Sequence, residues 1–249
     1  MSSAALHVHA GHQGHGHGGG GGRYLLELGP VRLAAGEEGL LRFRVVGDHA
    51  GRPVLTSYQE QHGKELHLIV ASRDLTVYRH LHPVRGEGGE WTVSVALPKG
   101  GDYRVFADFR PVGGDSVTAG ADLRVGGAGE SAPLPPVDGV FVTDGYEVRL
   151  DGGLTAGDGG GLVFSVSKDG RPVTDLEPYL GAYGHLVALR AADLAYLHVH
   201  PDGEPGDGRT PSGPEVSFHA TATAPGAHRL FLDFRHDGVV RTAAFTVDA

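Results

Sequence analysis

The sequence predicts an all-β protein, with two tandem immunoglobulin-like antiparallel β-sandwich domains behind a flexible N-terminal tail rich in His and Gly. Short segments of alternating apolar and polar residues, separated by clusters of Gly, Pro and Asp, follow one another from Tyr24 onward without a helical period. The same order of motifs occurs twice. Tyr103 follows Gly100, Gly101 and Asp102 and begins an alternating segment, which is typical of the tyrosine corner of immunoglobulin-like sandwiches.

Residues 1–22 form the predicted tail. Its histidines alternate with glycine, and it has too few apolar residues to offset the entropy lost on ordering. Imidazoles on a glycine chain can wrap around a divalent ion, so we expect a loose metal chelator. The alternatives are a cloning tag, against which the irregular spacing argues, or a solvated tail without function. The tail histidines are His7, His9, His12, His15 and His17.

Residues 23–126 form the first predicted domain. Its alternating segments have the spacing of an antiparallel sandwich. The expected strands cover residues 40–46, 66–71, 76–82, 91–97, 103–109 and 121–125. Residues 127–137 are rich in Gly and Pro and lack periodicity, so they form the predicted linker, and residues 138–249 form the second predicted domain.

The second domain repeats the motifs of the first, which indicates duplication. In each copy a lone histidine stands thirteen residues before a His-x-His motif that is followed by proline. These histidines are His67, His80 and His82 in the first copy and His185, His198 and His200 in the second. The segment that begins at Tyr103 recurs with His228 in place of the tyrosine. We therefore expect His228 to be a structural corner residue and not a ligand.

The composition excludes several classes of site. The chain of 249 residues has no Cys, and its only Met is residue 1, so disulfides, zinc–thiolate sites, iron–sulfur clusters, a cysteine nucleophile and a blue-copper centre are excluded. A formal charge of −9 disfavours nucleic acid and anionic membrane as partners and fits a cationic ligand. No apolar run of membrane-spanning length and no signal peptide is visible, so the sequence predicts no membrane span.

The clustered histidines favour metal binding. Side chains two apart on a strand share a face, so each His-x-His offers two imidazoles, and a neighbouring strand can bring the lone histidine beside them. Imidazoles without sulfur ligands favour Cu(II) or Zn(II), bound only when the rings are neutral, so binding should weaken below about pH 6. The expected ligands are His185, His198, His200 and His219 in the second domain and, with less weight, His67, His80 and His82 in the first. The alternative is that these histidines are merely half buried and hydrogen-bonded.

Three segments, residues 176–187, 196–201 and 217–220, resemble the YtkA-like and FixH-like sandwich domains of bacterial proteins. That resemblance implies an extracytoplasmic protein that handles copper, with the four second-domain histidines as ligands. The chain departs from the resemblance in showing no export signal. The sequence thus favours a non-catalytic protein for metal capture, buffering or delivery, whose partners are the metal ion and a protein that exchanges metal with it.

Two other functions compete with this one. The first is a cupin-like metal-dependent oxygenase or isomerase, because Glu204 follows the second His-x-His at cupin spacing and Glu87 is near that spacing in the first copy. Against it, Ala192 and Asp74 stand where cupins have glycine. The second is an adhesion or scaffold sandwich that binds no metal. No Gly-x-Ser-x-Gly elbow supports a serine hydrolase.

Overall fold

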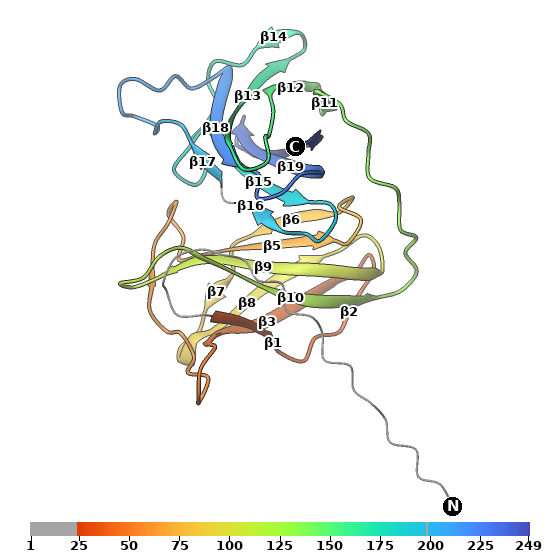
Figure 1. The fold of residues 1–249 in the computed structure, drawn as a ribbon, viewed down its shortest axis with the longest axis vertical. Coiled ribbons are helices and arrows are strands. Elements are labelled where there is room, and N and C mark those ends of the chain that lie inside the picture. The colour runs from red at the N-terminus through yellow and green to blue at the C-terminus, as the bar shows by residue number, and fades with distance from the viewer. Residues whose placement is uncertain (1–23, 198) are drawn as a thin grey trace, which may run out of the picture.

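The structure is a computed structural model that describes residues 24–197 and 199–249, and it shows two β-sandwiches connected by an extended segment (Figure 1). The fold class expected from the sequence is confirmed. The predicted tail of residues 1–22 and the candidate ligand His198 lie outside the described residues. Among the described residues, no helix is long and apolar enough to cross a membrane.

The first sandwich has one sheet in the order β1-β3-β8-β7 and a second in the order β2-β10-β9-β5-β6, with β4 paired to β9. Each segment expected to be a strand in this domain is one, with ends shifted by a few residues. The elements are β1 (Tyr24–Leu28), β2 (Leu33–Ala34), β3 (Glu38–Gly47), β4 (Tyr58–Gln59), β5 (Leu66–Ser72), β6 (Tyr78–Leu81), β7 (Val84–Arg85), a 3₁₀ turn η1 (Glu87–Gly89), β8 (Glu90–Ala96), β9 (Gly101–Pro111) and β10 (Val117–Gly126).

The second sandwich repeats this plan with sheets in the orders β11-β12-β13-β18-β17 and β16-β15-β19-β20, and β14 pairs with β13. The elements are β11 (Val140–Thr143), β12 (Tyr146–Gly152), β13 (Gly159–Lys168), β14 (Arg171–Pro172), β15 (Gly184–Arg190), β16 (Tyr196–Leu197), β17 (Val199–Pro201), β18 (Glu215–Thr221), β19 (Ala227–His236) and β20 (Val239–Asp248).

Each His-x-His lies where the chain passes from one sheet of its sandwich to the other. In the first domain β6 pairs with β5, and β7 pairs with β8 of the opposite sheet. In the second domain β16 pairs with β15, and β17 pairs with β18 of the opposite sheet. In the first copy the expected strand over residues 76–82 ends earlier, because β6 stops at Leu81 and the chain joins the opposite sheet as β7. In the second copy His198, between β16 and β17, lies outside the described residues.

The corner at the start of β9 is confirmed, and so is its counterpart at β19. The hydroxyl of Tyr103 donates to the carbonyl oxygen of Lys99 at 2.7 Å. In the second domain Nδ1 of His228 donates to the carbonyl oxygen of Gly226 at 2.8 Å. A ring N–H thus replaces the phenol O–H, and His228 is structural as expected.

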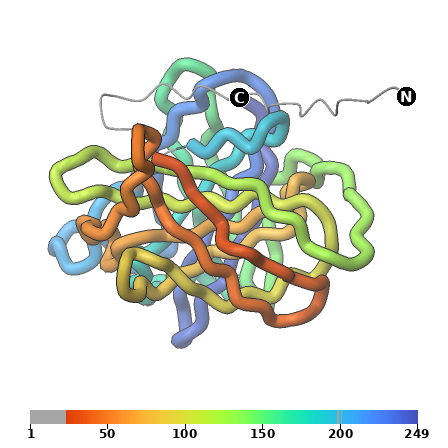
Figure 2. The backbone as a smooth tube through the Cα atoms, turned by 90° about the horizontal axis from the view of Figure 1, so that it is seen from below, coloured from red at the N-terminus to blue at the C-terminus, as the bar shows by residue number. Residues whose placement is uncertain are grey.

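The two sandwiches pack face to face and share an apolar layer. Every residue of β5 is buried, because one face of the strand lines the first domain's core and the other meets the second domain. On β15, Val187 and Leu189 face the same shared layer, which also contains Ile69, Leu75 and Phe106. Figure 1 shows β5, β6 and β9 beside β15 and β16, and the view from below places the first domain in front of the second (Figure 2).

Equivalent residues of the two copies meet reciprocally across this interface. Tyr78 stacks on Phe231 with ring centroids 4.1 Å apart, and its counterpart Tyr196 contacts Phe106 with centroids 5.6 Å apart. The domains are therefore related by an approximate two-fold arrangement, in which each presents the same sheet to the other. The sequence repeat implied duplication but not this docking of one copy on the other.

Candidate metal centre

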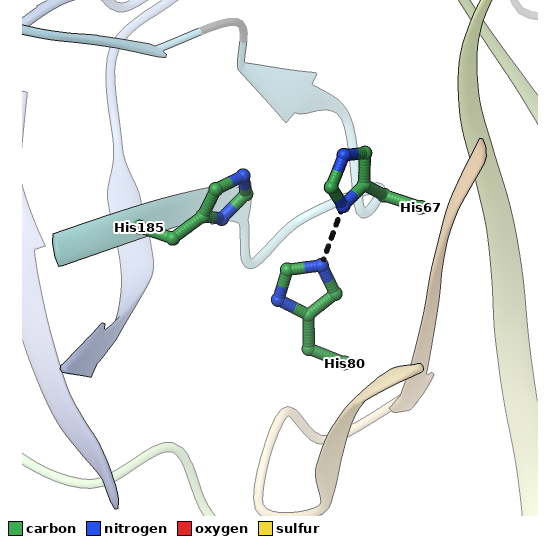
Figure 3. Close-up of side chains that lie close together, drawn as sticks. All are labelled: His67, His80 and His185. Atoms are coloured by element: carbon green, nitrogen blue, oxygen red, sulfur yellow. Dashed lines mark hydrogen bonds between the residues drawn. The ribbon is translucent and has the colours of Figure 1, made fainter. Parts of the chain in front are cut away.

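Three imidazoles converge at one end of the interdomain layer. They belong to His67 on β5, His80 on β6 and His185 on β15, and one ligand nitrogen from each lies within 4.8 Å of the others (Figure 3). Two of these histidines therefore come from the first domain and one from the second. This departs from the expectation that each domain builds its own three-histidine site.

Strand pairing accounts for the positions of His67 and His80. In the β5/β6 ladder Ile69 lies opposite His80, so these side chains share a face with His67, two residues earlier on β5. That face is the one that meets the second domain. The sequence left the register and face of these strands undetermined. In the structure both are such that His67 and His80 lie side by side in the first copy. His82 is close as well, with its ring centroid 4.9 Å from that of His80 and 5.3 Å from that of His67.

Hydrogen bonds to groups outside the cluster fix the proton on one nitrogen of the His67 ring and on one nitrogen of the His80 ring. Nε2 of His67 lies 3.0 Å from the carbonyl oxygen of Gln61, which can only accept, so Nε2 donates. Nδ1 of His80 donates to Oδ2 of Asp233 at 2.8 Å. In the neutral rings Nδ1 of His67 and Nε2 of His80 are left with lone pairs, and these two nitrogens face each other at 3.1 Å.

Two facing lone pairs repel unless a cation lies between them, and that cation is either an additional proton or a metal ion. The separation suits a metal ion. Nitrogens that each lie about 2.0–2.1 Å from a tetrahedral zinc ion are about 3.3 Å apart, close to the observed 3.1 Å. An Asp that holds the far nitrogen of a ligating His is the usual outer-shell partner in such sites, because it fixes the ring and raises its basicity.

Two more ring nitrogens in the cluster are buried without a hydrogen-bond partner among the described residues. They are Nδ1 of His185 and Nε2 of His82. The ring of His185 lies 4.7 Å from that of His80 and 5.3 Å from that of His67, centroid to centroid. A buried polar atom without a partner is destabilising by about 1–3 kcal/mol. A bound metal ion would remove that penalty at His185.

The rings of His67, His82 and His185 are neutral at physiological pH, as metal ligation requires. Burial lowers the pKa of His67 to about 3, an effect that the hydrogen bond to Gln61 only partly offsets and that the neighbouring histidines reinforce. Burial, with the nearby His80, lowers the pKa of His82 to about 4. The pKa of His185 is also well below its usual value, mainly through burial. Protons therefore compete weakly for these nitrogens.

Two aspartates, Asp233 buried and Asp108 half-buried, flank the cluster at equivalent positions of the two copies. Asp233 on β19 accepts from His80 and, at 2.5 Å, from the hydroxyl of Thr242. Asp108 on β9 accepts from Thr118 at 3.3 Å, and burial raises its pKa to about 6. The unpartnered ring nitrogens, with the Asp233 carboxylate behind His80, favour a cation at this site.

Of the expected second-domain ligands, His185 and His219 lie on opposite sides of their sandwich, and the side chains of His198 and His200 are outside the described part of the structure. His219 lies on the outer face of β18, 69% exposed at its side chain, where Nδ1 contacts Asp202 at 3.0 Å. His185 faces the other way, out of the opposite sheet, because Phe218 beside His219 and Leu186 beside His185 fill the core between them. Only the backbone of His200 is described, and it pairs with His219.

The carboxylates of the cupin-like alternative are not near the cluster's ligand atoms. Glu204 lies exposed in the loop after β17, and Glu87 lies exposed in η1. Among the described residues, the group of three potential ligands contains histidine alone. The two-histidine, one-glutamate arrangement is therefore not formed by the first motif. The side chains of His198 and His200 in the second motif lie outside the described part of the structure.

Sequence reasoning missed the aspartates and the interdomain position. A signal for the aspartates was present, since Asp108 and Asp233 both stand before Phe-Arg in the repeated segment, at a position surrounded by apolar residues. A charged residue inside a strand that is buried on both faces needs a partner. No pattern in the sequence showed that the partner of His80 would lie 153 positions along the chain, in the other domain.

The chain matches one family model, described as a domain of unknown function (DUF8832), over residues 20–127 and again over residues 141–249. The curated proteins searched contain no match. The matching family is neither the YtkA-like nor the FixH-like domain, so that resemblance stays a prediction.

Several solved structures are similar over most of this chain. The D00-D0 domain of Intimin is 12% identical over 90% of this chain and 98% of its own, with a TM-score of 0.26. The adhesin InvE of Yersinia pseudotuberculosis is 11% identical over 90% of this chain and 58% of its own, also with a TM-score of 0.26. Domains 4 and 5 of the S-layer protein SbsC are 10% identical over 91% of this chain and 96% of their own, with a TM-score of 0.26. Similarity at this level carries no argument about function.

Proposed function

We propose that this chain, which belongs to the DUF8832 family and carries two copies of its domain, is a non-catalytic protein that binds one Cu(II) or Zn(II) ion between its two sandwiches. The observation that carries the proposal is the 3.1 Å approach of Nδ1 of His67 to Nε2 of His80, when the opposite nitrogen of each ring already donates elsewhere. His185 supplies a third imidazole, whose buried Nδ1 has no other partner among the described residues.

Imidazole ligands without sulfur fit Zn(II) and Cu(II) better than hard cations such as Mg(II) or Ca(II). Three protein nitrogens leave at least one coordination position of the ion open to water or to another ligand. An ion held in this way can be released to a partner, so the arrangement serves capture and delivery better than permanent structural binding. The negative formal charge of −9 favours the approach of cations over long range.

The test separates this site from the tail, which offers histidines of its own. The protein to use is the full chain with His→Asn substitutions at the tail histidines, hereafter the tail-silent protein; the substituted positions are His7, His9, His12, His15 and His17. Titration with Zn(II), and with Co(II) for its ligand-field absorption, should show one saturable site with nitrogen ligands. The site should disappear in His185→Leu and persist in His219→Asn, a histidine that lies on an outer face.

A tail-silent protein that shows no saturable binding would disprove the proposal. Unchanged binding by His185→Leu would disprove the ligand assignment. Because His185 makes no side-chain hydrogen bond through Nδ1, its replacement by Leu leaves no described group without its partner. Loss of binding in this variant is therefore not explained by a broken hydrogen-bond network, and circular dichroism with a thermal melt verifies folding.

A scaffold or adhesion role without metal is the second candidate. It is favoured by the architecture alone, since two sandwiches that share a buried apolar layer form a continuous unit suited to presenting an outer surface. This role predicts the same unfolding midpoint with and without Zn(II) or Cu(II). Metal binding to the folded state predicts a midpoint that rises with free metal concentration, because a ligand of the native state stabilises it by mass action.

A further inference from the structure

A tight turn of the first domain places a further imidazole, that of His62, beside the metal centre. In this turn the backbone N–H of Gln61 donates to Lys64 at 2.8 Å and that of Lys64 donates back at 3.1 Å. The two central residues, His62 and Gly63, have φ values of 52° and 71°. Both values are positive, as in a type I′ hairpin turn, where Asn, Asp and Gly are the usual residues. Residues other than glycine are uncommon at positive φ, and His is among the types that tolerate it best.

The second domain has the same turn with a different residue at that place. The backbones of Tyr179 and Ala182 exchange hydrogen bonds of 2.8 and 3.2 Å around Leu180 and Gly181, whose φ values are 55° and 75°. Leu180 stands five residues before His185, as His62 stands five residues before His67. The turn therefore needs no imidazole for its own geometry.

The two turns abut at the interface, and this brings His62 to the centre. A Cβ added to Gly181 would lie 3.7 Å from Cα of His62. The ring of His62 is 5.8 Å from that of His185 and 6.2 Å from that of His67, centroid to centroid. His62 is exposed, whereas His67 is buried. It does not belong to the group whose ligand nitrogens lie within 4.8 Å of one another.

We infer that His62 is an exchange ligand, which binds the metal ion at the protein surface and passes it to His185 and His67 on uptake, with the reverse order on release. The inference rests on the proposed function of the centre. A hydrated ion that enters a buried site must lose its waters, and the loss is least unfavourable when protein nitrogens replace them one at a time. An exposed imidazole next to the buried ones supplies the first replacement.

This role has a kinetic signature that distinguishes it from other roles. An exchange ligand lowers the barrier between the free and bound states without contributing to either, so its loss slows association and dissociation by the same factor and leaves the equilibrium constant unchanged. A resident fourth ligand would instead contribute to affinity. A residue needed only for the turn would change neither rate once the turn is preserved.

The variant His62→Leu preserves the turn, because Leu180 occupies the equivalent position with nearly the same φ. In the tail-silent protein, stopped-flow mixing with Co(II) gives the association rate, and competition with a chelator gives the dissociation rate. We expect both rates to fall by the same factor, at least several-fold, with the dissociation constant unchanged. The matched control is His219→Asn, which removes an exposed imidazole on a distant face and should leave both rates unaltered.

The other outcomes overturn the inference. Rates equal to those of the parent would show that ions reach the centre without His62. Weaker affinity with an unchanged association rate would make His62 a resident ligand. If the parent itself binds no Co(II) in an equilibrium titration, the proposed function fails and the inference fails with it, whereas either kinetic outcome leaves the proposed function intact.

Discussion

Asp233 of the second domain accepts the Nδ1 proton of His80 of the first domain at 2.8 Å, and the side chains are only 2% and 3% exposed. The orientation of the His80 ring, a proposed ligand in one sandwich, is therefore set by a carboxylate in the other. Since His185 also comes from the second domain, neither copy holds the complete centre. Metal affinity should consequently depend on the docking of the two domains.

The substitution His185→Leu should stabilise the metal-free protein while it abolishes metal binding. It replaces a ring with an unpartnered buried nitrogen by an apolar side chain next to Val187 and Leu189 in the interdomain layer. We expect a gain of about 1 kcal/mol in the free energy of unfolding, measured with urea in the presence of a chelator. A loss of stability greater than this gain would show that His185 has a structural hydrogen-bonding role.

The substitution Asp233→Asn should weaken metal binding by roughly 10–100-fold, the usual effect of removing the outer-shell partner of a ligating His. The amide oxygen can still accept from His80, but without the negative charge that raises the basicity of the ring. The matched control is Asp108→Asn, the equivalent residue of the other copy, which accepts from Thr118. Equal losses of Zn(II) affinity in the two variants would contradict the assignment of Asp233 to His80.

Acidification should destabilise the metal-free protein as the pH falls below about 6.5, the ordinary pKa of His in unfolded chains. Because the folded-state pKa of His67 is about 3, the unfolded state binds more protons in this interval, so the stability present above pH 6.5 is lost as pH falls toward 3. His82, with a pKa of about 4, acts in the same direction. Asp108 acts oppositely, since its folded-state pKa is raised to about 6 and its stabilising effect grows as the pH falls through that value.

The histidines that destabilise the fold on acidification outnumber the one carboxylate that stabilises it. We therefore expect a net decrease in the free energy of unfolding between pH 7 and pH 4.5, measured by urea titration at each pH. A flat or rising profile would contradict the neutral buried state of these rings. The low pKa of His67 also shifts the expected loss of metal affinity at this centre below the value near pH 6 that ordinary imidazoles predict.

The substitution Phe231→Ala should destabilise the protein by roughly 3–5 kcal/mol, as is typical when a large aromatic is removed from a buried layer. It removes the partner on which Tyr78 stacks at 4.1 Å. The reciprocal variant Phe106→Ala removes a looser contact, at 5.6 Å from Tyr196, and should have the smaller effect. Thermal melts of both variants provide the comparison, and a larger effect of Phe106→Ala would contradict the stated asymmetry.

The elements of this protein could be predicted from local patterns in the sequence. Alternation of apolar and polar residues gave the strands, because a strand between a core and solvent must alternate. The corner at Tyr103 and its counterpart at His228 could also be predicted, since each depends on a hydrogen bond to a residue fewer than five positions away. The pairing of β5 with β6, which carry His67 and His80, could be predicted from their short connection, but its register could not.

The composition of the candidate site required the tertiary structure. Alternation does not reveal whether the second face of β5 meets solvent or another domain, so the burial of His67, Ile69 and Ala71 against the second domain was not predictable. For the same reason the sequence did not show that His219 and His185 lie in different sheets, because β18 belongs to the sheet that faces away from the interface.

The sequence by itself determined a duplicated β-sandwich in which the same pattern of histidines occurs twice. It could do so because strand periodicity, turn residues and sequence repeats depend on residues close together in the chain. Only the tertiary structure decided which imidazoles meet. It placed His185 beside His67 and His80, and it placed Asp233 behind His80, through the docking of one copy on the other. That docking is driven by apolar area and shape over the whole shared layer, which no short motif encodes.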